Sequence, residues 1–401
     1  MASTIKATNI STPDGTGNIT VDRPLSGSGA SLTSLPAANL TGTLPAIDGS
    51  NLTGVAVGKN LIINGAMNVA QRGTSFAALA SGYSLDRWKF VAGSIGVYTV
   101  TQDSSGPAGF ANSLKIDCTT ADASPSGTDY LQLRYHLEGQ DLQHLKKGTG
   151  SAESVTLSFW VKCNKTGNFA SRIYDNDNDR IIGSTVTINS ADTWEYKSIT
   201  YAGDTTGALD DDINKSIMMD FLFDAGSTYT SGSVPTSWEA YTNADYAAGI
   251  TLALADSTSN YINITGVKLE VGTSATDFEP RSIGEEILMC QRYYEVSHSW
   301  GDNSQYQGQA PVFGMNGASY GATVGDVQGK IWNVHKRAAP TVTLYADDGT
   351  SGAITRMSDS SKYTGVSAKY MNEYGFFKVY KASTFANMTT YYYAYAADAE
   401  L

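Results

Sequence analysis

Residue types that often reveal a protein's chemistry are scarce in this sequence. Its 401 residues include 3 Cys and 4 His, only 16% are charged, and the formal net charge is −12. Cys118, Cys163 and Cys290 are odd in number and far apart, so they predict neither a disulfide framework nor a Cys-based zinc site. The negative charge argues against a nucleic-acid partner, because phosphates bind to a basic stripe. A neutral or weakly charged partner, such as a glycan, fits this composition better.

Targeting segments and long apolar runs are also missing. The chain does not open with a basic segment followed by an apolar one, and no window approaches the ~18 apolar residues of a membrane span. We therefore expect no membrane insertion, no secretion by the signal-peptide route, and assembly in a reducing cytoplasm.

A catalytic set of side chains cannot be found either. His136, His144, His298 and His335 occur singly, outside any nucleophile motif or metal-spaced pair. No pair of carboxylates stands out, and the regular coil repeats of a β-helix are absent from the sequence pattern. We therefore expect that the protein is not an enzyme. Cleavage of polysaccharide by two carboxylates is the alternative.

Gly, Tyr and neutral polar residues are abundant instead. The 40 Gly and 24 Tyr accompany runs of Ser, Thr, Asn and Asp, which is typical of turn-rich, mainly β proteins. Short segments with strand-like patterns predict a two-sheet sandwich, most simply a jelly roll, and a helical turn is expected at residues 140–146. The predicted strands are residues 96–101, 113–118, 130–137, 154–162, 180–188, 194–201, 217–223, 250–254 and 261–271.

The most informative stretch changes its hydrophobic period halfway along. Residues 261–271 alternate as a half-buried strand does, and Pro280 then interrupts the extended pattern. Ser282 and Glu285 have the spacing of a capping box, which predicts a short connector helix over residues 283–296. Its apolar positions at helical spacing are Ile283, Ile287, Cys290 and Tyr294.

The chain before residue 59 has a different character. Residues 1–26 have the pattern of a small hairpin, and residues 27–58 repeat the motifs L-P-A and L-T-G. Isolated leucines among Gly, Ser, Thr and Pro cannot be buried within one chain, whereas three parallel copies could bury them on a common axis. This predicts a thin repeat shaft in an intertwined homotrimer, and a flexible linker is the alternative. The axial leucines would be Leu35, Leu40, Leu44 and Leu52.

Several of these motifs together resemble tail fibre proteins of tailed bacteriophages. They are the L-P-A and L-T-G repeats, the connector K-L-E-V-G…F-E-P-R-S-x-G-E-E…C-Q-R-Y-Y, and the ending A-D-A-E-L. The pieces N-L-I-I-N-G-A-M, S-L-D-R-W, L-S-F-W-V-K and D-T-W-E-Y-K-S-I-T-Y resemble the domain that precedes this connector in phage fibres, which in turn resembles carbohydrate-binding jelly rolls.

The resemblance implies a structural virion protein. It would be a homotrimer in the virion tail, assembled in the host cytoplasm, attached to a phage tail protein by its N-terminus, and recognising host surface polysaccharide. A freestanding carbohydrate-binding module and a tail-spike depolymerase are the alternative functions. The helix would pack near the three-fold axis through Ile283, Ile287 and Cys290.

The expected organisation has five parts in chain order. They are a virion-attachment segment (1–26), the shaft (27–58), a jelly-roll domain (59–272), the connector with its helix (273–298) and a C-terminal β domain (299–401). In the last part, the clearest strands are residues 341–345, 376–380 and 391–395.

Aromatic residues in polar loops are the candidates for glycan binding. Sugar rings stack on exposed Trp or Tyr, and loops on a rigid scaffold commonly carry recognition. The candidates are Trp238, Tyr241, Tyr246, Trp300, Tyr306 and Tyr320. Trp88, Trp160 and Trp194 lie in strand-like patterns and are expected in the core.

One acidic cluster has the character of a metal site. Asp175, Asp177 and Asp179 alternate with Asn, and such oxygen ligands suit calcium. An acidic hairpin turn explains the same residues equally well, because Asn and Asp tolerate turn geometry. No other cofactor is expected.

Overall fold

The computed structural model describes residues 60–297, 315–316, 325–381 and 390–401. All of them belong to the compact unit Ala56–Leu401. The predicted attachment segment and shaft lie outside the described residues. So do the candidate residues Leu35, Leu40, Leu44, Leu52, Trp300, Tyr306 and Tyr320.

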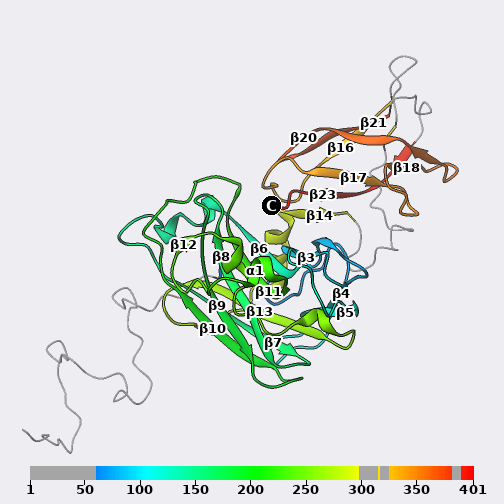
Figure 1. Cartoon of the computed structure of the whole chain (residues 1–401). Coiled ribbons are helices and arrows are strands. Elements are labelled where there is room, and N and C mark those ends of the chain that lie inside the picture. Colours follow the sequence, from blue (N-terminus) through cyan, green and yellow to red (C-terminus); the bar gives the residue numbers. More distant parts are fainter. Residues whose placement is uncertain (1–59, 298–314, 317–324, 382–389) are drawn as a thin grey trace, which may run out of the picture. The chain divides into compact units, whose positions relative to one another are not determined.

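Two large antiparallel sheets form a β-sandwich (Figure 1). In spatial order, the first sheet contains β1 (Ser75–Phe76), β4 (Val97–Asp103), β5 (Ser113–Thr120), β13 (Tyr261–Val271), β7 (Val155–Cys163) and β10 (Glu195–Tyr201). The second contains β12 (Glu239–Ala240), β9 (Arg180–Ile188), β8 (Gly167–Asp175), β11 (Lys215–Ala225), β6 (Tyr130–Glu138), β3 (Trp88–Gly93) and β2 (Ser81–Tyr83). This confirms the prediction of a mainly β sandwich.

The hydrophobic core lies between these two sheets. Phe159 from the first sheet meets Phe221 from the second at a ring-centre distance of 4.8 Å, and both rings are fully buried. Burying one such side chain contributes about 1.5–3 kcal/mol. Along β6, Leu131, Leu133 and Tyr135 belong to this core, so the residues between them point to the outer face of the second sheet.

Among the described residues, three short α-helices accompany the sheets: α1 (Ser227–Thr230), α2 (Asn243–Tyr246) and α3 (Ile283–Gln291). The capping box of α3 is confirmed, because the Ser282 hydroxyl accepts a hydrogen bond from the Glu285 amide and the Glu285 carboxylate accepts one from the Ser282 amide. The helix ends at Gln291, earlier than the predicted residue 296. The reason is that residues 294–296 form strand β14 and pair with β23.

The described residues of the C-terminal part form three small sheets. They contain β14 (Tyr294–Val296), β23 (Ala394–Asp398) and β17 (Thr341–Tyr345); β15 (Met315–Asn316), β22 (Thr390–Tyr392), β18 (Ala353–Arg356) and β19 (Lys362–Thr364); and β16 (Gly325–Ile331), β21 (Gly375–Lys381) and β20 (Val366–Asn372). The predicted strand 391–395 is divided, because Tyr391 pairs in one sheet and Tyr395 in another.

Most of the predicted sandwich strands are present, but one prediction was wrong. Residues 250–254 are not a strand. Ala253 has a left-handed backbone with φ of 48°, and a 3-10 helix, Leu254–Asp256, follows it. The helical turn expected at 140–146 is present as two short 3-10 helices, Gly139–Asp141 and Gln143–Leu145.

A buried histidine is expected to make stability depend on pH. His136 on β6 is 2% exposed, and burial together with the nearby Arg134 and Lys89 lowers its pKa from 6.5 to about 2. Below pH 6.5, His136 therefore binds a proton in the unfolded chain but stays neutral in the folded chain. The contribution of His136 to the free energy of unfolding is fully present above pH 6.5 and falls as the pH drops from there toward 2. Between pH 7 and pH 5 this one group lowers the free energy of unfolding by about 2 kcal/mol.

Urea unfolding at these two pH values would measure the effect. A His136→Gln variant should lose about 2 kcal/mol less than the wild type on acidification. Replacing the exposed His144 with Gln is the matched control and should leave the difference unchanged. Equal losses for the wild type and for His136→Gln would contradict the prediction.

Candidate functional site

The outer face of the second sheet carries a row of polar and aromatic side chains. Gln132 and Arg134 on β6 alternate with core residues, and Asp220 on β11 lies directly opposite Arg134 in the strand register. Tyr174 comes from β8 and Asn176 from the turn that follows it. Strand periodicity therefore brings side chains from three strands together.

The segment between β11 and β13 folds over part of this face. Helices α1 and α2 are joined there by a hydrogen bond from the Ala247 amide to the Tyr229 carbonyl, at 2.8 Å. Thr242 caps α2 by accepting a hydrogen bond from the Asp245 amide. An apolar cluster with Leu222 of β11 anchors this segment on the sheet.

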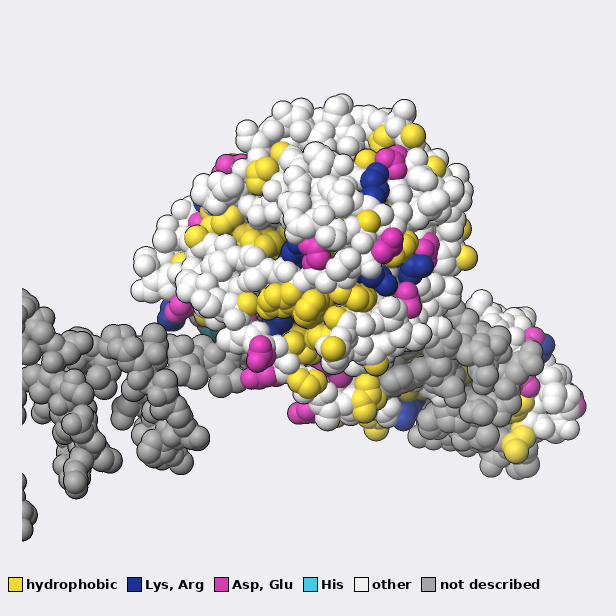
Figure 2. Space-filling view, turned by 90° about the horizontal axis from the view of Figure 1, so that it is seen from below, with side chains coloured by type: hydrophobic (Ala, Val, Ile, Leu, Met, Phe, Trp, Pro, Cys, Tyr) yellow, Lys and Arg dark blue, Asp and Glu magenta, His cyan; other side chains and the backbone are white. Residues whose placement is uncertain are grey.

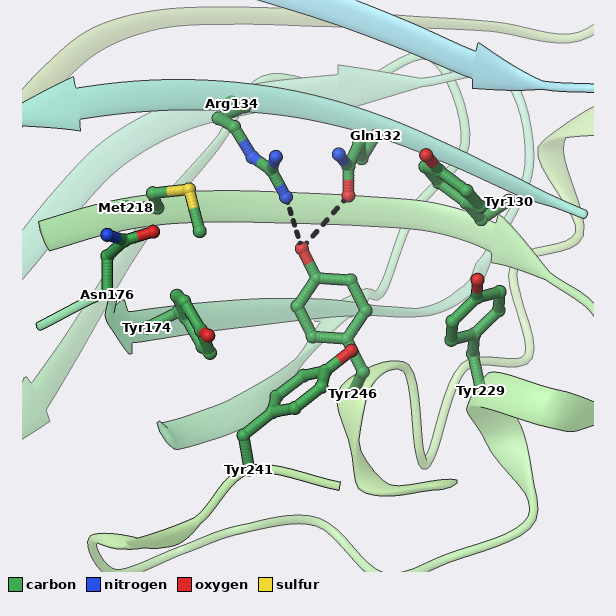
Figure 3. A pocket seen from close by; sticks show the side chains of 9 residues that line it. All are labelled: Tyr130, Gln132, Arg134, Tyr174, Asn176, Met218, Tyr229, Tyr241 and Tyr246. Carbon is green, nitrogen blue, oxygen red and sulfur yellow. Dashed lines mark hydrogen bonds between the residues drawn. The ribbon is translucent and has the colours of Figure 1, made fainter. Parts of the chain in front are cut away.

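Together, the sheet face and this segment enclose a cleft of about 260 Å³, which we call the tyrosine cleft (Figure 3). Its lining residues are Tyr130, Gln132, Arg134, Tyr174, Asn176, Met218, Tyr229, Tyr241 and Tyr246.

An ion pair and a phenol form the floor of the tyrosine cleft. Arg134 donates to both oxygens of Asp220, from Nε at 2.6 Å and from Nη2 at 3.2 Å. The Tyr246 hydroxyl accepts from Arg134 Nη2 at 2.7 Å and lies 2.5 Å from Asp220 Oδ2 and 3.0 Å from Gln132 Oε1. Asp220 is fully buried, so this network fixes the guanidinium in one orientation.

Two pairs of tyrosine rings stand on either side of Tyr246 (Figure 3). Tyr174 and Tyr241 meet edge to face at 5.1 Å, and Tyr130 and Tyr229 do so at 5.4 Å. Burial raises the pKa of Tyr241 to about 12 and that of Tyr174 and Tyr246 further, so these hydroxyls stay protonated at neutral pH. Each of these hydroxyls already donates to a protein oxygen, so the cleft offers apolar ring surface beside the polar side chains of Gln132, Arg134 and Asn176.

The predicted loop aromatics have three different outcomes. Tyr241 lines the tyrosine cleft, and its predicted role in glycan binding stays a prediction. Tyr246 is only 7% exposed, so it forms the floor and is not the exposed loop ring that was predicted. Trp238 is outside this cleft, where it packs against the main core and donates from Nε1 to the Ala202 carbonyl at 2.7 Å.

Sequence reasoning missed the other cleft residues. Most of them lie on strands, where they alternate with core residues, and only this alternation could have indicated that they face outward. They are Tyr130, Gln132, Arg134, Tyr174, Asn176, Met218 and Tyr229.

The three carboxylates that were predicted to bind calcium each interact with a different protein partner. Asp175 is fully buried, pairs with Lys147 at 2.5 Å, and accepts hydrogen bonds from the amides of residues 177 and 178. Asp177 accepts from the Asp210 amide, and Asp179 accepts from the Tyr174 hydroxyl. Within the described ranges, no group of three His, Cys, Asp or Glu is placed to hold a metal ion. The acidic hairpin turn is therefore the better explanation.

The residues predicted for the core and for the trimer interface differ in how far they are buried. Trp88 is fully buried as predicted, whereas Trp160 on β7 and Trp194, just before β10, are only partly buried. Cys290 is fully buried against Ile63 and Val69 of the same chain, which leaves it no surface for a contact with another copy.

One face of the described part carries few charges. Figure 2 shows one face on which hydrophobic side chains gather in patches and charged side chains are scattered between neutral surface. Among the described helices, none is long and apolar enough to cross a membrane.

The fold and the cleft define an antiparallel β-sandwich with an aromatic cleft on one sheet. No protein-family model and no curated protein sequence matches the chain. Solved structures give distant matches. The enzymatically active domain of tailspike protein 4 from bacteriophage CBA120 is 13% identical with a TM-score of 0.29, covering 53% of this chain and 21% of that one. The chain thus matches about a fifth of that tailspike domain.

Two carbohydrate-binding modules are matched over nearly their full length. The family 11 module from Clostridium thermocellum, solved with a β-1,3-1,4-mixed-linked tetrasaccharide, is 11% identical with a TM-score of 0.25, covering 51% of this chain and 98% of that one. The CBM22-1 xylan-binding domain of Xyn10C from Paenibacillus barcinonensis is 10% identical with a TM-score of 0.25, covering 54% and 97%.

Proposed function

We propose that this protein binds a glycan in the tyrosine cleft. The observation that carries the proposal is the combination of five tyrosines with Gln132, Arg134 and Asn176 in one open cleft. Tyrosine rings stack on the apolar face of a pyranose, while amide and guanidinium groups hydrogen-bond to its hydroxyls. A cleft of about 260 Å³ has room for a short stretch of sugar and not for a macromolecular partner.

A glycan array probed with the purified full-length chain tests this proposal. We expect binding to a limited set of oligosaccharides, confirmed by calorimetry with the tightest of them. Competition by that oligosaccharide in solution should release the protein from the array. Absence of binding across a broad array would count against the proposal.

We further propose that the chain acts as a homotrimeric tail fibre that carries this glycan site on a phage virion. The shaft repeats, the connector and the A-D-A-E-L ending support this function, as does the exposed side of α3. Ile283 and Leu288 on that helix are 53% and 52% exposed, and a contact with other copies would remove this apolar surface from water. Ile287 is half-buried against the same-chain cluster and would contribute less.

Replacing Leu288 with Asp is expected to convert trimers into single chains, because assembly would bury an unpaired carboxylate. Light scattering would measure the mass of each variant. Met357→Asp, at a residue that is 58% exposed on another strand connection, is the control and should keep the trimer. A shortened chain that begins at Lys59 should trimerise weakly or not at all. An unchanged mass for Leu288→Asp would remove α3 from the proposed interface.

A freestanding carbohydrate-binding module is the second candidate, and the compactness of the unit Ala56–Leu401 favours it. It predicts a monomer with and without the first 58 residues. We propose no enzymatic activity. A depolymerase would shorten host surface polysaccharide during prolonged incubation, whereas a binding protein would leave it intact.

A further inference from the structure

Arg134 is the one charged residue among the nine that line the tyrosine cleft in the described structure. Its side chain is 19% exposed and lines the cleft. An arginine recognises a carboxylate best through two parallel hydrogen bonds from one edge. Here the Nε and Nη2 edge already makes those two bonds with Asp220. Nη2 also donates to the Tyr246 hydroxyl, so Nη1 is the guanidinium nitrogen that remains for a ligand.

The charge of this arginine is also largely neutralised. Asp220 lies directly behind it with no exposure to solvent, so water screens the pair poorly. At one side of the cleft, Tyr174 donates to the carboxylate of Asp179. Through Asn176 the cleft adjoins a polar hollow with more carboxylates than cations. The charged residues of that hollow are Asp177, Asp210, Asp212, Lys215 and Arg337.

We infer that the tyrosine cleft takes neutral sugars and rejects acidic ones, and that Asp220 sets this preference. The inference rests on the proposed glycan binding and deepens it. A neutral hexose can accept from Arg134 Nη1 and exchange hydrogen bonds with the amides of Gln132 and Asn176. A uronic acid would instead bring its carboxylate beside Asp220, without the two-bond edge that could offset the repulsion.

An array that pairs neutral hexose oligosaccharides with the same oligosaccharides oxidised at C6 to uronic acids tests this inference with the full-length chain. We expect each oxidised form to bind at least about tenfold more weakly than its neutral parent. Asp220→Asn removes the charge with little change in shape, and it should reduce that ratio by about tenfold. Asp398→Asn, at a half-exposed carboxylate outside the cleft, is the matched control and should preserve the ratio.

The outcomes separate this inference from the function on which it depends. Oxidised oligosaccharides that bind as tightly as their parents would overturn the neutral preference and leave glycan binding standing. This comparison uses the wild-type protein alone, so it tests the neutral preference even if Asp220→Asn fails to fold. A folded Asp220→Asn variant with the wild-type ratio would overturn the role of Asp220. If no member of either series binds, both the proposed function and this inference fall.

Discussion

Replacing Glu400 with Ala is expected to lower the free energy of unfolding by about 3–5 kcal/mol, because it leaves a buried arginine without its partner. Glu400 is 3% exposed, and its Oε2 accepts a hydrogen bond from Arg87 Nη1. Arg87 is 1% exposed, donates from Nη2 to the His136 carbonyl at 2.7 Å, and lies 3.4 Å from the centre of the Tyr293 ring. The guanidinium is almost wholly removed from water in the folded protein, so it depends on protein groups to offset its charge.

Asp398→Ala is the matched control in the same tail. Its carboxylate is 46% exposed and lies 3.3 Å from Arg72, so its loss should cost less than about 1 kcal/mol. Urea unfolding followed by tryptophan fluorescence would compare the two variants. Equal, small losses for both would show that the Arg87 pair contributes little to stability.

This ion pair also joins three motifs that lie far apart in the chain. Arg87 belongs to S-L-D-R-W, Tyr293 to C-Q-R-Y-Y, and Glu400 to A-D-A-E-L. In the structure they form one buried contact, and the backbone of β14 pairs with that of β23 beside it. The first motif supplies the buried guanidinium, the last supplies the carboxylate that offsets its charge, and the middle one supplies the ring that packs against it.

Local patterns in the sequence were sufficient for many of the strands. Residues 180–188 and 261–271 were predicted with the bounds that the structure gives, because their apolar residues recur at strand spacing. The capping box of α3 was equally readable, since it depends on two residues three positions apart.

Strand β8 shows why other elements were missed. It contains Arg172, which is fully buried and donates to the carbonyls of Ser184 at 2.7 Å and Ala248 at 2.9 Å. Gly183 leaves room for it, because a Cβ there would lie 2.2 Å from the arginine Cδ. From sequence alone, a charged residue in a strand-like segment indicates a surface position, because its distant hydrogen-bond partners cannot be identified.

The tyrosine cleft was only half predictable for a similar reason. Tyr241 could be proposed because it lies in a polar loop, and loops often carry recognition. The opposite wall depends on the register that places Arg134 of β6 across from Asp220 of β11. Such a pairing joins residues far apart in the chain, and no local pattern in the sequence specifies it.

Replacing Tyr241 with Ala is expected to weaken glycan binding by about tenfold to a hundredfold. The change removes one ring from the cleft wall and leaves Tyr174 without its edge-to-face partner at 5.1 Å. Tyr241→Phe should bind nearly as the wild type does, because the lost hydroxyl donates to Asn243 and the ring remains.

Tyr196→Ala is the control that distinguishes binding at a specific site from non-specific binding to exposed aromatic residues. Tyr196 is 47% exposed on β10 of the first sheet, where it packs against Trp160 at 5.4 Å and has no part in the tyrosine cleft. Calorimetry of the full-length variants with the tightest neutral oligosaccharide would give the dissociation constants. If Tyr196→Ala lost as much affinity as Tyr241→Ala, the sugar would not be bound by the cleft alone. If Tyr241→Ala lost affinity while Tyr241→Phe and Tyr196→Ala kept it, the binding energy would depend on the Tyr241 ring itself, since the Phe variant lacks the hydroxyl but keeps the ring.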